Sequence, residues 1–102
     1  MKATKMKRLK AAGWKAGTVQ QFLGLSDDEA ALVELKLALM AAVRQARTKR
    51  GLSQTALAQR MGSSQSRVAK IETGDPSISL DLIVRAFLAT GATRRELGRV
   101  FG

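Results

Sequence analysis

From residue 26 onward, apolar residues recur at spacings of three and four, which is the period of one face of an α-helix. Serine, threonine and glycine residues interrupt this pattern at points where helices commonly begin and end. No segment alternates apolar and polar residues with the period of a strand, so the chain is predicted to be all-α. With their caps, about five core helices are expected, over residues 27–49, 53–62, 63–74, 80–90 and 93–101.

The longest expected helix, residues 27–49, carries apolar residues over an unusually wide arc. Its two neighbouring stripes are, first, Leu32, Leu35, Leu39, Val43 and Ala46 and, second, Val33, Leu37 and Met40. An arc of this width predicts burial on two sides. One side should cover the two helices within residues 53–74, and the other should cover either segment 14–25 or a second subunit. Ser26 and Glu29 have the spacing of a capping box, which should begin this helix.

Both ends of the chain are expected to add short helices. Ahead of the long helix we expect one ending at Gly13 and another that begins with a Thr18–Gln21 capping box. Near the other end, Thr93 and Glu96 are expected to cap the last helix. Residues 80–90 should bury Leu82, Ile83, Ala86 and Phe87, and the last helix carries the apolar residues Leu97, Val100 and Phe101. We therefore divide the chain into an N-terminal extension, 1–25, and one helical domain, 26–102.

Charge and composition narrow the class of function. The 102 residues carry a net charge of +10 and contain neither cysteine nor histidine. Such a charge is typical of nucleic-acid binding, although it would also suit an anionic membrane surface or simply solubility. Without histidine or cysteine, the usual zinc ligands, general base and thiol nucleophile are missing. We expect no enzyme, metal or cofactor, and no membrane association, since no apolar run could span a bilayer and no signal peptide is visible. A cytoplasmic protein is expected.

Residues 53–74 have the signals of two short helices joined by a tight turn. Ser53 suits the first N-cap and Gly62 suits the left-handed end of that helix. Ser63 or Ser64 should cap the second helix, which Gly74 ends. The outward positions of this second helix carry side chains that can bond base edges or phosphates, namely Gln65, Ser66, Arg67 and Lys70.

This stretch resembles the helix-turn-helix of the phage-repressor-like (Xre) family. The matching residues are Gln54, Ala58, Gly62, Ser64-Gln65-Ser66, Val68 and Ile71-Glu72-x-Gly74, and with flanking helices the resemblance covers roughly residues 35–100. It implies a repressor-like DNA-binding domain that binds duplex DNA sequence-specifically to regulate transcription, as a homodimer on a two-fold operator. The long helix departs from the family pattern, because its early turns exceed what the family's first helix usually needs.

The resemblance also implies roles for individual residues. Ser64, Gln65, Ser66 and Lys70 would read bases. Contacts to the DNA backbone would come from Ser53, Gln54 and Arg67. Independently of the resemblance, the charge of the N-terminus suggests that Lys2, Lys5, Lys7 and Arg8 lie on DNA phosphates, although the basic terminus could equally be a solvated tail. Arg47 would pair with Glu72 across the domain, because a carboxylate late in a helix opposes the dipole and needs a partner. The charges of Arg94, Arg95 and Arg99 are expected to form a solvated face, with contact to the DNA backbone as the second choice.

Several alternatives stay open on the sequence. A regulator of this size could stand alone or be an autoregulating antitoxin with a cognate toxin protein as partner, a choice that rests on size and family analogy. The same fold could serve as a protein-interaction module, but the polar outward face of residues 64–73 favours DNA. RNA is a weaker alternative, because the aromatic residues Trp14, Phe22, Phe87 and Phe101 are all expected to be buried rather than free to stack on bases.

Overall fold

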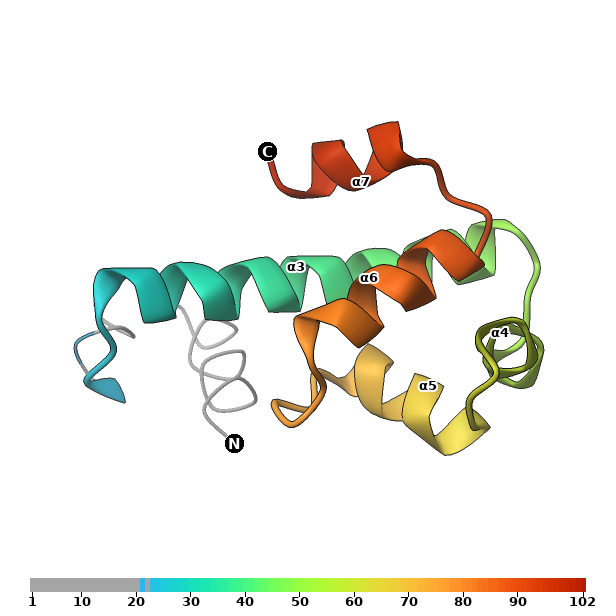
Figure 1. Cartoon of the computed structure of the whole chain (residues 1–102), viewed down its shortest axis with the longest axis horizontal. Coiled ribbons are helices and arrows are strands. Elements are labelled where there is room, and N and C mark those ends of the chain that lie inside the picture. The colour runs from blue at the N-terminus through green and yellow to red at the C-terminus, as the bar shows by residue number, and fades with distance from the viewer. Residues whose placement is uncertain (1–20, 22) are drawn as a thin grey trace.

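A computed structural model describes residue 21 and residues 23–102. Within that part the protein is all-α, with five helices and no strand. The helices are α3 (Asp27–Lys49), α4 (Gln54–Met61), α5 (Gln65–Thr73), α6 (Leu80–Ala89) and α7 (Arg94–Val100), shown in Figure 1. They confirm the five expected core helices. The short helix ending at Gly13 and Thr18 of the Thr18–Gln21 capping box lie outside the described residues.

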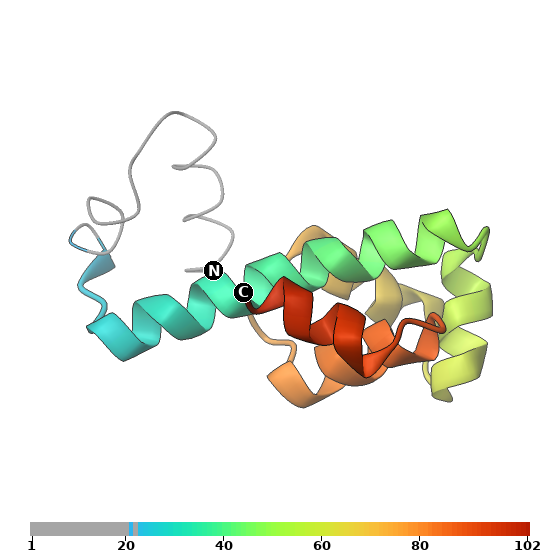
Figure 2. The same ribbon diagram turned by 90° about the horizontal axis from the view of Figure 1, so that it is seen from above.

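Helix α3 is the axis on which the other helices are placed. It packs against α5, α6 and α7, while α4 packs against α5 and α6. Figures 1 and 2 show α6 running beside the second half of α3 and α7 returning along it on the side away from α4 and α5. The predicted capping box begins α3, because the Ser26 hydroxyl accepts from the Glu29 N–H and the Glu29 carboxylate accepts from the Ser26 N–H. None of the described helices is long and apolar enough to cross a membrane.

Two serine caps and two glycines set the bounds of α4 and α5, and Gly62 and Ser64 among them form the turn between the two helices. Ser53 and Ser64 each accept a backbone N–H from the residue three positions later. Gly62 and Gly74 end the two helices with φ angles of 64° and 81°, in the left-handed region that favours glycine. Helix α5 packs against α3 and α4, and α4 packs against α5 and α6, so the turn fixes α5 on one flank of the core.

One core holds the described helices together. Its largest fully buried side chains are Leu39, Val43, Leu57, Val68, Ile71 and Ile83. They come from α3, α4, α5 and α6, so each of these helices contributes the apolar face that the sequence predicted.

Some apolar side chains are more exposed than their spacing predicts. Leu32 and Leu35 are 46% and 36% exposed, because the first turns of α3 extend past the start of α6 and the end of α7 (Figures 1 and 2). Phe101 is 42% exposed at the end of α7, and Leu82 is half-buried, so the expectation that both are buried is wrong. Leu82 is one of the partly buried side chains that pack against the core, whereas Phe101 is the residue that ends α7.

Candidate nucleic-acid interface

Helix α5 buries one face and presents a polar one. Val68 and Ile71 are completely buried, whereas the outward side chains Gln65, Ser66, Arg67 and Lys70 are exposed. Helices α4 and α5 lie on the side of the molecule opposite α7 (Figure 1). The structure thus gathers the four outward residues on one exposed helix at the edge of the domain, where a large partner can reach them.

The first turn of α5 is organised by its own serines. The Ser64 hydroxyl accepts a hydrogen bond from the Arg67 N–H at 3.2 Å and lies 3.3 Å from the Ser66 hydroxyl. The Ser64 hydroxyl therefore uses one acceptor position for the cap. The Ser66 hydroxyl makes no capping bond, so more of its hydrogen-bonding capacity remains.

The amides of Gln54 and Gln65 join the starts of the two helices. Gln65 Nε2 donates to Gln54 Oε1 at 2.6 Å, and Gln54 Nε2 donates to Glu72 Oε1 at 3.2 Å. Each amide carries two N–H donors. After these bonds, Gln54 keeps one amide N–H, and Gln65 keeps one amide N–H and its carbonyl oxygen, for a further partner.

Arg47 and Glu72 form a bidentate ion pair between the end of α3 and the end of α5. Arg47 Nε lies 2.6 Å from Glu72 Oε2, and Arg47 Nη2 lies 2.8 Å from Glu72 Oε1. Arg47 Nη1 also donates to the Leu52 carbonyl at 2.8 Å. The side chains are only 13% and 4% exposed, so the pair is largely withdrawn from water.

The environment keeps both partners charged. Burial opposes ionisation of Glu72, but hydrogen bonds from Arg47 and Gln54, together with the charges of Arg47 and Arg44, outweigh it and lower the pKa of Glu72. The hydrogen bond to Glu72 raises the pKa of Arg47, against the opposing effect of burial. Glu72 is thus an acceptor-only carboxylate at neutral pH.

A polar groove runs beside the start of α5 and was not found from the sequence. It encloses about 420 Å³ and is lined by Ser64, Ser66, Arg67, Lys70, Ser77, Ile78, Ser79 and Leu82. Ser77 and Ser79 reach it from the α5–α6 loop, where Ser79 also caps α6. The sequence did not indicate this groove, because the approach of the α5–α6 loop to α5 depends on how α6 packs. The groove combines hydroxyls with two cations, a set suited to phosphate oxygens.

Several arginines away from α5 donate hydrogen bonds to other residues of the protein. Arg50 donates to Glu96 at 3.3 Å, Arg60 donates to the Ala89 carbonyl at 3.3 Å and Arg85 to the Met61 carbonyl at 3.5 Å. They tie the ends of α3 and α4 to the α6–α7 region. Their side chains therefore contribute to the packing of the domain.

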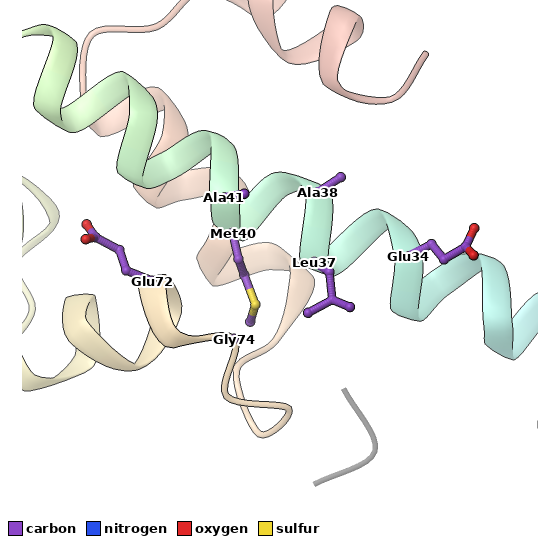
Figure 3. A pocket seen from close by; sticks show the side chains of 7 residues that line it. All are labelled: Glu34, Leu37, Ala38, Met40, Ala41, Glu72 and Gly74. Carbon is purple, nitrogen blue, oxygen red and sulfur yellow. The ribbon is translucent and has the colours of Figure 1, made fainter. Parts of the chain in front are cut away.

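A second groove is largely apolar. It measures about 330 Å³ and lies between α3 and the end of α5, lined by Glu34, Leu37, Ala38, Met40, Ala41, Glu72 and Gly74. Figure 3 shows Leu37 and Met40 pointing toward Gly74, with the Glu72 carboxylate turned away from them. A Cβ at Gly74 would lie 3.5 Å from Leu37 Cδ2, an ordinary packing distance. This apolar groove therefore lies where the end of α5 packs against α3.

No group of three or more potential metal-ligating residues gathers anywhere in the part of the chain that the structure describes.

The family model for helix-turn-helix domains matches residues 43–97, just over half of the chain, from the second half of α3 into α7. No curated protein and no solved structure matches the chain. The match includes every residue of α4, α5 and α6 and leaves the early turns of α3 outside, which is where the sequence departed from the family pattern.

Proposed function

The chain belongs to the Xre-type helix-turn-helix family of DNA-binding transcription regulators, and from this we propose that it is a sequence-specific repressor whose α5 enters the major groove. The observation that carries this proposal is the exposed polar face of α5, beginning with Gln65 in the first turn. This family is generally non-enzymatic. We further propose residues 26–102 as the DNA-binding domain and 1–25 as its basic extension.

Gln65 is the proposed principal base reader. Its free carbonyl oxygen and remaining N–H match the N6 donor and N7 acceptor that adenine presents in the major groove. Ser64, Ser66 and Lys70 flank it on the same helix and would contact neighbouring base edges. The polar outer face also favours DNA over a protein partner, whose recognition would call for apolar contacts.

The DNA backbone would be held on both sides of α5. On one side, Ser53 and Gln54 begin α4, where the helix dipole and free backbone N–H groups favour a phosphate. On the other side, Arg67 and the serines of the polar groove, Ser77 and Ser79, are positioned for a second phosphate. Phosphate contacts on both flanks would fix the register of α5 in the groove.

Replacing Gln65 by alanine tests the base-reading role. We expect a loss of about 1–3 kcal/mol in binding to a site obtained by selection from random duplexes, and a much smaller loss on unselected DNA, because only a base edge carries sequence information. Fluorescence anisotropy titrations on both DNAs would measure this. Gln45→Ala, an exposed glutamine on α3, is the matched control. Equal losses on both DNAs would remove Gln65 from the base-reading role.

We also propose that the protein acts as a homodimer on a palindromic operator. The exposed Leu32 and Leu35 support this, because they leave apolar surface on the protruding turns of α3. Sedimentation should show a dimer that Leu32→Ser with Leu35→Ser converts to a monomer. Leu88→Ser, on a leucine of α6 that is 38% exposed, should leave it dimeric. A monomeric wild type, or an unchanged dimer after the double substitution, would contradict the proposal.

A further inference from the structure

A continuous chain of hydrogen bonds runs from the end of α3 to the tip of α5. It passes from Arg47 to Glu72, from Glu72 to Gln54 and from Gln54 to Gln65, over donor–acceptor distances of 2.6–3.2 Å. Only its last member, Gln65, is exposed. The chain therefore connects a nearly buried ion pair to the side chain proposed to read bases.

Glu72 sets the direction of donation along this chain of hydrogen bonds. A carboxylate can only accept hydrogen bonds, so Gln54 must turn its Nε2 toward Glu72, because the opposite orientation would place two acceptors face to face. Gln54 Oε1 then faces α5, and Gln65 must meet it with Nε2. One ionised group thus fixes the orientation of two amides.

The orientation of Gln65 has a consequence for base recognition. One Nε2 hydrogen is bound to Gln54, so the nitrogen lies on the Gln54 side and the carbonyl oxygen lies on the far side. In the major groove, the base pair would therefore face the Gln65 N–H donor on the Gln54 side and the Gln65 carbonyl acceptor on the far side. Adenine offers N7 and N6 in one order only, so a reversed amide would place donor against donor and acceptor against acceptor.

We propose that Glu72 is a specificity-positioning residue, which makes no contact with DNA but fixes the order of donor and acceptor that Gln65 presents. This inference rests on the proposed function, since it assumes that Gln65 reads a base. It assigns to the Arg47–Glu72 pair a second role beside stability. Arg47 contributes by holding the Glu72 carboxylate in place with two hydrogen bonds.

The test is the base preference at the operator position that Gln65→Ala identifies. Relative affinities for the four base pairs at that position would be measured with wild type, Glu72→Gln and Arg47→Lys. In Glu72→Gln the side chain at position 72 can donate as well as accept, so both orientations of Gln54 become available. We expect discrimination to fall about tenfold, within the range that one bidentate contact confers. Arg47→Lys keeps the carboxylate ionised, so the preference should persist even if stability falls.

A merely structural role for Glu72 would weaken binding to all four duplexes equally. Gln54→Ala should remove the same discrimination between base pairs as Glu72→Gln. The two losses of discrimination should not add, because both substitutions interrupt the same series of hydrogen bonds. If Glu72→Gln does not fold, Arg47→Met with Glu72→Leu replaces the pair by apolar side chains and should show the same loss. Unchanged discrimination in the folded variants would overturn the inference. Failure of wild type to select any sequence would instead refute the proposed function.

Discussion

Replacing Glu72 by alanine is expected to lower the free energy of unfolding by about 3–5 kcal/mol, because it leaves the Arg47 guanidinium without its counter-ion in a largely buried site. Two of the three hydrogen bonds that Arg47 makes end on Glu72, and only the bond to the Leu52 carbonyl would remain. Arginine stays protonated, so deprotonation cannot reduce the free-energy cost of the unpaired guanidinium. Small domains are commonly stable by only about 5–15 kcal/mol, so this single change should move the urea midpoint strongly.

The ion pair between Arg50 and Glu96 offers a matched control. Arg50 and Glu96 also join the end of α3 to another helix, at 3.3 Å, but their side chains are 27% and 32% exposed. Glu96→Ala should therefore cost only about 0–1 kcal/mol. The double replacement Arg47→Met with Glu72→Leu should recover much of the loss at position 72, because an apolar pair of similar volume leaves no unpaired charge. A loss below about 1 kcal/mol for Glu72→Ala would show that the pair contributes no more than a surface contact.

The helix boundaries could be predicted because local chemistry decides them. Ser26, Ser53, Ser64, Ser79 and Thr93 each accept a backbone N–H three residues later. Such caps satisfy donors within four residues of chain, so nothing remote is needed to recognise them. The same applies to the left-handed glycines that end α4 and α5.

The sequence was less informative where distant elements decide the outcome. Leu32 and Leu35 have the spacing of buried residues, yet they are exposed because α6 and α7 do not extend as far as these turns. The polar groove joins Ser77 and Ser79 to α5 only through the packing of a loop. The Arg47–Glu72 contact spans 25 residues of chain, and only the family resemblance suggested that these two charges meet. The bond between Gln54 and Gln65 was not predicted at all.

Neutralising the basic residues of the N-terminal extension is expected to make DNA binding much less dependent on salt. Lys5, Lys7 and Arg8 lie outside the described residues, and their proposed role as phosphate contacts rests on their charge and spacing in the sequence. Each phosphate that a cation neutralises releases counter-ions, which contributes about 0.9 to the slope of log K against log salt concentration. Replacing all three by glutamine should therefore flatten the slope by between two and three, on cognate and unselected DNA alike.

The control for this experiment removes three charges from the opposite side of the domain. Arg94, Arg95 and Arg99 are exposed on α7, which lies across α3 and α6 from the proposed DNA-binding helix (Figure 1). Their replacement by glutamine changes net charge by the same amount, but it removes no close phosphate contact, so the slope should change far less. If both triple variants flatten the slope equally, the effect reflects overall charge and not an arm on the DNA. An unchanged slope for the N-terminal variant would mean that these residues make no phosphate contact, and the extension would then be a solvated tail or a protein-binding segment.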